Sequence, residues 1–284
     1  MPGSRLLSRI QEIATKVHFG EIAVAFHDFE SALRFSYQGD RWFHAASTFK
    51  AGILFAFFKA AEEGRIRIDD HLQVRNRFVS VANGGIYRVQ SDRDGDSTVH
   101  KRVGRSMRLL DLATVMITRS SNLATNLLLD FLSVDFVRRC LRDAGVEGVE
   151  IRRGVEDLAA HEAKINNEAT ADGLLRLFRV FLDEKHLAEP HRAKAMEILL
   201  AQEFKSMLPG KLPHDVRVAH KTGEISTHCH DVGIVLSPGR QPYVVAIMTE
   251  TTPETEKRSR GVAEISATIY RYIVGSGREE KHPP

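Results

Sequence analysis

A serine and a lysine three residues apart, Ser47 and Lys50, could together carry out nucleophilic chemistry. They begin a segment with helical character, so their side chains project from one face, about a turn apart. A serine hydroxyl is a poor nucleophile until a base removes its proton. A lysine amine acts as that base only when burial or a nearby positive charge keeps it neutral. The apolar helix would supply the burial, and Lys221 the charge if it folds nearby; the alternative is an N-cap serine and a surface lysine.

Two further motifs hold polar groups that such a nucleophile would need. Ser120 and Asn122 interrupt two helical runs with a hydroxyl and an amide, although a plain helix junction also favours these residue types. Lys221, Thr222 and Gly223 end a strand-like segment with an ammonium, a hydroxyl and a residue without Cβ. Such a strand end can bind a substrate carboxylate, and glycine lets a ligand approach the backbone. The alternative for this motif is an ordinary surface strand end.

The three motifs are informative only as a set. In a chain of this composition, chance produces about 0.8 Ser-x-x-Lys, about 0.4 Ser-x-Asn and about 0.04 Lys-Thr-Gly matches. All three in this order resemble the penicillin-recognising serine hydrolases, and among them the class A β-lactamases. The resemblance covers nearly the whole chain in the order of its expected elements. It implies an α/β (α+β) fold of the β-lactamase/transpeptidase type and an acyl-enzyme mechanism that needs no metal or cofactor.

The resemblance also assigns a role to each motif residue. The implied roles are the nucleophile Ser47, the base Lys50, the proton relay Ser120, the acyl-side-chain ligand Asn122, the carboxylate ligands Lys221 and Thr222 beside Gly223, and Glu224, whose backbone N–H would stabilise the oxyanion together with that of Ser47. The substrate would be a β-lactam or a related peptide-like or ester-like acyl compound. The site would lie where the sheet and the helical part meet.

The chain departs from the family pattern at three places. Ser121 stands where the family usually has the aspartate of Ser-Asp-Asn. Residues 81–105 form an excursion, rich in glycine and charge, that is longer than usual and expected to border the mouth of the site. The family's hydrolytic glutamate normally lies in a loop written roughly Arg-x-Glu-x-x-Leu-Asn, and here Glu156 comes one place late relative to Arg153. The third departure bears on turnover.

Glu156 is the expected general base for release of the acyl group, because a carboxylate beside the acyl-enzyme can activate a water. Its offset could turn the side chain out of the pocket, so we expect rapid acylation at Ser47 followed by slow deacylation. The alternative, that Glu156 and Asp157 are solvated loop charges, is equally open. Fast turnover that does not depend on the Glu156 carboxylate would instead make Asp157 or Glu168 the candidate.

Two clusters contain metal-ligand residue types but do not predict a metal site. The segment Asp92–Asp96 is similar to a calcium loop, yet glycine falls at its fourth position and Val103 replaces the closing glutamate. His228 and His230 would face one side of a strand, and the cysteine between them would face the other. We therefore expect neither a metal nor a cofactor.

The composition, 43% hydrophobic and 27% charged in 284 residues, is that of a globular protein with room for one large domain. The net charge of +3 is spread along the chain, so nucleic acid is not an expected partner. Charged residues interrupt the N-terminal apolar residues, and the apolar run 51–58 is too short for a bilayer, so we expect no membrane insertion. The chain as written would be cytoplasmic, or secreted or periplasmic if an export signal was removed.

Two cysteines, Cys140 and Cys229, are too few for a disulfide framework, and the helical pattern around Cys140 favours a small buried thiol. Nothing in the sequence requires a second copy of the chain. We expect a monomer that acts on a small-molecule acyl substrate.

Periodicity predicts helices at both ends and in the middle of the chain, with strands between them. The expected helices cover 6–17, 47–63, 107–118, 123–132, 134–143, 170–184, 190–201 and 255–274, and the expected strands cover 21–26, 32–37, 216–221, 231–236 and 243–248. Because the middle block is all-helical, the strands should form one antiparallel sheet flanked by the terminal helices. We expect one β-lactamase-like domain over 1–284, with 1–46 plus 212–284 forming the sheet part and 47–211 the all-helical part.

The function expected from these observations is that of an active-site serine hydrolase, which opens β-lactams or related amides and esters through an acyl-enzyme at Ser47. Two alternatives stay open. One is a peptidase or esterase of the same fold with little β-lactamase activity. The other is a non-hydrolytic penicilloyl-binding module.

Overall fold

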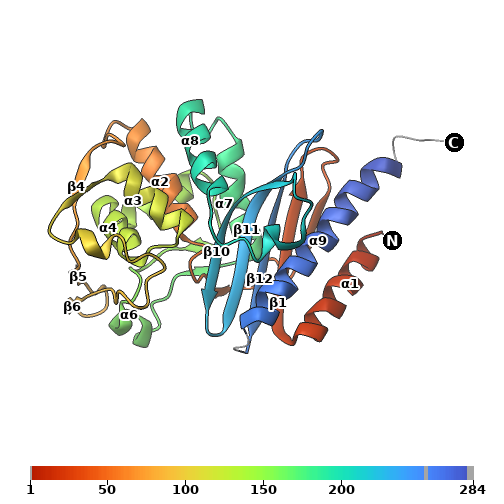
Figure 1. The fold of residues 1–284 in the computed structure, drawn as a ribbon, viewed down its shortest axis with the longest axis horizontal. Coiled ribbons are helices and arrows are strands. Elements are labelled where there is room, and N and C mark those ends of the chain that lie inside the picture. The colour runs from red at the N-terminus through yellow and green to blue at the C-terminus, as the bar shows by residue number, and fades with distance from the viewer. Residues whose placement is uncertain (1, 253–254, 280–284) are drawn as a thin grey trace.

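A five-stranded antiparallel sheet lies between two groups of helices in the computed structural model, which describes residues 2–252 and 255–279 (Figure 1). Its strand order is β10-β11-β12-β1-β2. The strands are β1 (Phe19–Asp28), β2 (Arg34–Tyr37), β10 (Arg217–Ile225), β11 (His228–Leu236) and β12 (Tyr243–Thr251). Strands from the two ends of the chain thus pair directly, β1 with β12, which confirms the predicted single antiparallel sheet.

The first and last helices cover one face of this sheet. They are α1 (Pro2–Val17) and α9 (Thr255–Glu279), which pack against each other beside the sheet (Figure 1). Apolar side chains repeat on α1 at helical spacing, at Leu6, Ile10 and Ile13, and all three are buried. They share a core with the sheet residues Val24 and Phe26. This layer holds the sheet from behind, on the side away from the motif residues.

The remaining helices lie on the other side of the sheet. They are α2 (Lys50–Glu62), α3 (Leu109–Thr118), α4 (Asn122–Leu132), α5 (Val134–Asp143), α6 (Leu158–Glu162), α7 (Ala171–Arg179) and α8 (Glu189–Leu200), with the short 3₁₀ helices η1 (His100–Arg102) and η2 (Val180–Leu182). A third 3₁₀ helix, η3 (Leu208–Lys211), packs instead against α9 and shares its core. Helix α2 is buried on nearly every side, as its all-round apolar sequence predicts. It packs against α3, α4, α5 and α8. Its N-terminal end faces the sheet edge formed by β10, and this places Lys50 next to the Lys-Thr-Gly strand.

The excursion is more regular than expected. Short strands pair within and around it, and a small sheet forms further along the chain. The short strands are β3 (Phe43–His44), β4 (His71–Gln73), β5 (Phe78–Val79), β6 (Ile86–Tyr87), β7 (Ser106–Arg108), β8 (Val149–Glu150) and β9 (Glu168–Ala169), paired as β4-β7, β5-β6 and β3-β9-β8. Strands of two or three residues leave no alternating pattern to read, so the sequence could not predict them.

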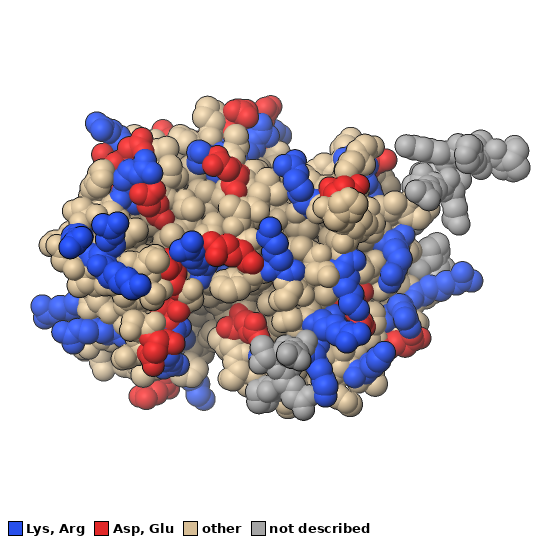
Figure 2. Space-filling view, in the orientation of Figure 1, with Lys and Arg blue, Asp and Glu red and all other residues tan. Residues whose placement is uncertain are grey.

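The charged side chains are mixed over the surface. On the face drawn in Figure 2, lysines and arginines alternate with aspartates and glutamates across both the helical side and the sheet side. Such mixing is the usual state of a globular surface. No helix in the described ranges combines the length and the apolar character that crossing a bilayer requires. Cys140 and Cys229 are both buried free thiols.

Candidate active site

Ser47 lies in a turn that leads into α2. The N–H of Lys50 donates to the Ser47 carbonyl at 3.3 Å and that of Ala51 to the Thr48 carbonyl at 3.2 Å, so residues 47–49 form tight turns before the α-helix begins. The N-cap is Phe49, which makes no side-chain cap. The expectation that Ser47 itself begins the helix is therefore wrong by three residues, because i→i−3 bonds replace the first α-helical turn.

Two cavities open beside Ser47. One has a volume of about 240 Å³ and the other about 390 Å³. Their walls share Ser47, Arg93, Asn122 and Glu224. The smaller cavity thus contains residues from all three motifs in its wall, together with Arg93 from the excursion. A substrate could place its reacting carbonyl at Ser47 and extend into both cavities.

The Lys50 amine is buried and held by the Ser120–Asn122 segment. Its Nζ lies 2.7 Å from the Ser120 carbonyl oxygen, 2.9 Å from Asn122 Oδ1 and 3.2 Å from Ser120 Oγ. No carboxylate is among these partners. Burial, and secondly the positive charge of Lys221, hold the pKa of Lys50 well below its ordinary value. A lysine in this environment can be neutral and act as a base.

The Lys221 amine approaches the same hydroxyl group from the other side. Its Nζ donates to Ser120 Oγ at 3.1 Å and to the Thr222 carbonyl at 2.8 Å. Burial lowers the pKa of Lys221 to about 7. The Ser120 hydroxyl therefore joins two buried amines, and a hydroxyl can pass a proton between groups at these distances because it both donates and accepts.

Three residues around the site adopt the left-handed backbone conformation that non-glycine residues rarely enter. Their φ angles are +48° at Ala46, +58° at Ser120 and +63° at Glu156. Each such conformation costs about 1–3 kcal/mol and persists only where the surroundings impose it. A strained backbone conformation thus sets the direction of the chain at Ala46, just before Ser47, and orients the side chains of Ser120 and Glu156. This signal is invisible in the sequence.

Gly223 lets β10 lie directly against Ser47. A Cβ built on Gly223 would come within 3.0 Å of the Ser47 nitrogen and 2.9 Å of Thr48 Cγ2. The next residue, Glu224, contacts Arg258 at 2.9 Å, and Arg258 also donates to the Ile225 and Ser226 carbonyls. Arg258 is a residue that sequence reasoning missed. It anchors the far end of β10 to α9.

Glu156 faces the site, contrary to the concern raised by its spacing. Its Oε1 accepts from Asn122 Nδ2 at 3.3 Å, and its Oε2 accepts from the Gln90 N–H at 2.8 Å. The positive φ at Glu156 turns the chain so that the late position still reaches the pocket. The carboxylate lies in the wall of the same cavity as Ser47.

The two other candidate carboxylates are used elsewhere. Asp157 accepts from Ser80 Oγ at 2.7 Å, from the Val81 N–H at 3.1 Å and from the Ala160 N–H at 3.1 Å, which caps α6. Glu168 pairs with Arg152 at 2.8 Å. Neither residue lines the cavities beside Ser47. Their contacts indicate structural roles, and this leaves Glu156 as the one of the three candidate bases that lines a cavity beside Ser47.

The histidine cluster is also structural. His230 Nε2 donates to the His44 carbonyl at 3.0 Å, and its Nδ1 accepts from the Thr249 N–H at 3.0 Å. Burial lowers the pKa of His230 to about 3. Within residues 2–252 and 255–279, no three His, Cys, Asp or Glu side chains come together as a set of metal ligands.

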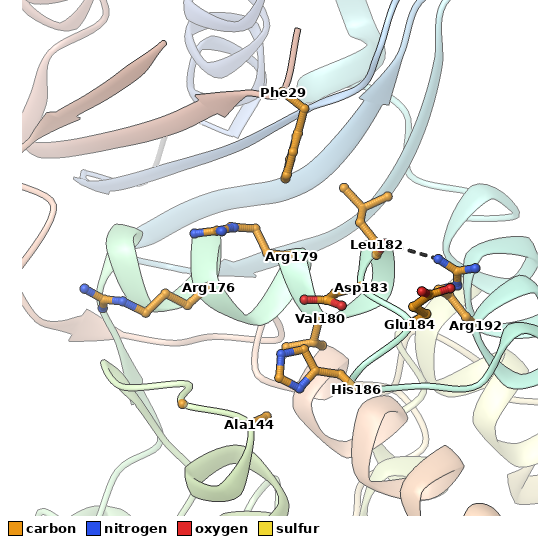
Figure 3. A pocket seen from close by; sticks show the side chains of 11 residues that line it. Phe29, Ala144, Arg176, Arg179, Val180, Leu182, Asp183, Glu184, His186 and Arg192 are labelled. Atoms are coloured by element: carbon orange, nitrogen blue, oxygen red, sulfur yellow. Dashed lines mark hydrogen bonds between the residues drawn. The ribbon is translucent and has the colours of Figure 1, made fainter. Parts of the chain in front are cut away.

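Another cavity, of about 490 Å³, lies apart from the motif residues. Figure 3 shows charged side chains of both signs lining it, among them Arg176, Arg179, Arg192, Asp183 and Glu184. Its walls contain no serine, threonine or cysteine. None of the motif residues lines it, so it is not the cavity that the three motifs indicate.

Comparisons with known proteins agree with this geometry. Residues 5–273 match the model of the β-lactamase enzyme family. The chain is 26% identical over 257 residues to β-lactamase ROB-1 of Haemophilus influenzae, covering 89% of this chain and 79% of that protein. A β-lactamase of Streptomyces fradiae is 27% identical over 230 residues, covering 72% and 74%.

Solved structures of similar proteins share the fold along nearly their whole length. An ancestral class A β-lactamase superposes with a TM-score of 0.81 at 26% identity, covering 95% of this chain and 99% of that one. A mutant of PBP-A in an acyl-enzyme complex with penicillin G superposes with a TM-score of 0.80 at 25% identity, covering 96% and 97%. The chain belongs to the β-lactamase enzyme family and is a class A β-lactamase-like serine hydrolase that works through an acyl-enzyme on a small-molecule substrate.

Proposed function

We propose that this protein opens β-lactams or closely related amides and esters by forming an acyl-enzyme at Ser47. One observation carries the assignment of the site. The Ser120 hydroxyl lies within hydrogen-bond distance of two buried amines, those of Lys50 and Lys221, in the wall of a cavity that Ser47 also lines. Such an arrangement can take a proton from a nucleophile and return it to a leaving group.

In the acylation step, Ser47 Oγ attacks the substrate carbonyl carbon and its proton passes to the neutral amine of Lys50. The carbonyl oxygen becomes an oxyanion, which the N–H groups of Ser47 and Glu224 stabilise. The C–N bond of the ring then breaks. The leaving nitrogen receives the proton through Ser120, and the ester at Ser47 remains.

The substrate is oriented by the groups around Ser47. Lys221 and Thr222 bind its carboxylate, and Gly223 lets their strand lie directly against Ser47. Asn122 Nδ2 donates to the carbonyl of the acyl side chain. In the deacylation step, the Glu156 carboxylate takes a proton from a water that attacks the ester carbon, and Ser47 leaves with a proton returned to its hydroxyl.

Nitrocefin kinetics with intact-mass analysis test this proposal. We expect nitrocefin turnover, an added acyl mass on Ser47 after brief exposure to a penicillin, and complete loss of both in Ser47→Ala. Ser91→Ala, a change at an exposed serine of the excursion, is the matched control and should leave both unchanged. An Ser47→Ala variant that still gains the ligand mass contradicts the assignment.

The same assay distinguishes the alternatives. Stable labelling without turnover would favour a non-hydrolytic penicilloyl-binding module. Faster hydrolysis of simple aryl esters than of nitrocefin would favour an esterase or peptidase.

We also infer a monomer, because the proposed site is complete within one chain, and no insertion into membranes, because the apolar run 51–58 is too short to cross a bilayer. Light scattering behind a size-exclusion column should give a mass near 31.9 kDa. A stable dimer whose activity depends on concentration would contradict this.

A further inference from the structure

We propose that Asp94, in the excursion, is a positioning residue that holds Ser120 and Asn122 against Lys50. This inference rests on the proposed function of Ser47, and it concerns a residue outside the three motifs. The middle residue of the second motif is Ser121, where the family usually has an aspartate, and Asp94 supplies a carboxylate at this place instead.

The Asp94 carboxylate binds the backbone at the start of α4. Its Oδ1 accepts from the Asn122 N–H at 2.8 Å, and its Oδ2 accepts from the Leu123 N–H at 2.9 Å. His100 Nε2 contacts Oδ2 at 2.9 Å and orients the carboxylate, whose side chain is completely buried. These N–H groups would otherwise lack partners, because the first turn of a helix has none within the helix. A carboxylate there also faces the positive end of the helix dipole.

This contact fixes the residues that hold Lys50. Ser120 has φ of +58°, a conformation that requires support from its surroundings. Its carbonyl and hydroxyl and the Asn122 amide are the three partners of the Lys50 amine. Asp94 holds the chain immediately after Ser120. Loss of its carboxylate would therefore let Ser120 and Asn122 move relative to Lys50.

Gly95 provides an independent sign that the excursion is built to meet this segment. A Cβ built on Gly95 would lie 2.3 Å from the Arg119 carbonyl oxygen, a distance that no side chain tolerates. The excursion can approach the Ser120–Asn122 segment this closely only with glycine next to Asp94. Arg93, the residue before Asp94, lines both cavities beside Ser47.

Ser121 marks a second place from which a carboxylate could make the same contacts. Its Oγ caps α4 by accepting from the Ala124 N–H at 3.2 Å, and it lies 3.4 Å from Asp94 Oδ2. An aspartate at 121 would place its oxygens close to those of Asp94. Two carboxylates in this buried space would repel each other, whereas either one alone could accept from N–H groups in the first turn of α4.

A double-mutant cycle uses this geometry. In Asp94→Asn, an amide nitrogen would face one of the two backbone N–H groups, so Ser120 and Asn122 would lose part of their support. We expect the acylation rate constant for penicillin to fall about tenfold or more, because a misplacement of about 1 Å can cost about a hundredfold in rate. Ser121→Asp alone should also slow acylation. The double variant Asp94→Asn/Ser121→Asp should recover to within about threefold of the wild type, a coupling expected only for residues in contact.

Asp92→Asn is the matched control, because it removes an exposed carboxylate two residues away. Hydrogen exchange supplies a readout that does not depend on activity: the Asn122 and Leu123 amides should exchange faster in Asp94→Asn and at the wild-type rate in Asp92→Asn. Gly95→Ala should slow acylation while keeping the Asp94 carboxylate. If Asp94→Asn does not fold, the double variant decides: folded and active supports the inference, and slow or unfolded overturns it.

The pH profile separates positioning from loss of structure. The charged groups facing the Lys50 amine are Lys221 of β10, Asp94 of the excursion and Glu156 of its loop. Removal of the Asp94 charge favours the neutral form of the Lys50 amine. The acidic side of the pH profile of the acylation rate should therefore shift to lower pH, even as the maximum rate falls. An unchanged acidic side would mark a merely structural role and overturn the inference.

The outcomes separate this inference from the proposed function. A wild type that never acylates contradicts the proposed function, while the exchange of the Asn122 and Leu123 amides still tests Asp94. A wild type that acylates, with Asp94→Asn acylating equally fast, contradicts this inference alone.

Discussion

Lys50 and Lys221 lie on different elements, α2 and β10, yet both amines contact one hydroxyl oxygen, at 3.2 and 3.1 Å. Both lysines are completely buried, so the cost of keeping two charges together in a region of low dielectric is high. Release of a proton from one amine reduces that cost. Burial and the proximity of the two lysines therefore both favour the neutral form of Lys50, which is the form that a base requires.

The two lysines should respond differently to replacement by arginine. Lys50→Arg keeps the charge but cannot be neutral, so acylation should fall by about a hundredfold or more, the range of general-base catalysis. Lys221→Arg should mainly raise KM, because it can still bind a carboxylate. Steady-state nitrocefin kinetics measure both. Lys59→Arg, at a lysine on the same helix that pairs with Glu62, is the control; equal and mild effects of the first two changes would remove both lysines from the site.

Stability should depend on pH through Lys221. Its pKa is about 7 in the folded protein against an ordinary value of 10.5, so between these values the unfolded chain binds more protons than the folded one. The free energy of unfolding must then rise with pH across this window. In Lys221→Met this contribution disappears, so the difference in unfolding free energy, wild type minus variant, should increase from pH 7 to pH 10. Urea titrations measure it. A difference that is flat or falls with pH would show that the amine is charged in the folded state, and Lys185→Met is the exposed control.

Replacement of Glu156 by glutamine should separate the two half-reactions. The amide can still bond to Asn122 but cannot accept a proton, so acylation should continue while the acyl-enzyme accumulates. Stopped-flow and intact-mass measurements follow the two steps. Asp157→Asn should instead lower the melting temperature, because Asp157 accepts three hydrogen bonds that hold the excursion and α6. Fast release unaffected by Glu156→Gln would refute both the base and the slow-release expectation.

Gly223→Ala should impair acylation by separating β10 from Ser47. The new Cβ would lie 3.0 Å from the Ser47 nitrogen, closer than nearly all real contacts of this kind, and the backbone on either side would have to shift. We expect acylation to fall about tenfold or more with little change in melting temperature. Gly20→Ala, whose Cβ would meet only an ordinary contact at 3.6 Å, is the control. Wild-type acylation in Gly223→Ala would show that the strand does not border the reacting atoms.

Much of the fold could be predicted from local sequence. The apolar repeat of α1, the all-round apolar sequence of α2 and the three C-terminal strands each follow from periodicity within one segment. The candidate catalytic residues could be named as well, because Ser-x-x-Lys, Ser-x-Asn and Lys-Thr-Gly each lie within four residues. A rare combination of short motifs in a fixed order is a property of the sequence alone.

The tertiary structure decided how these residues meet. Lys50 and Lys221 reach Ser120 across separations of 70 and 101 residues, which no local pattern encodes. The turn at Glu156 depends on a positive φ imposed by its surroundings, so a position that is late in sequence still faces the pocket. Asp94 belongs to a segment that is similar to a calcium loop in sequence, and only packing brings its carboxylate to the N–H groups of Asn122 and Leu123. Sequence determines which groups are available, whereas long-range packing determines which of them share one buried, low-dielectric space.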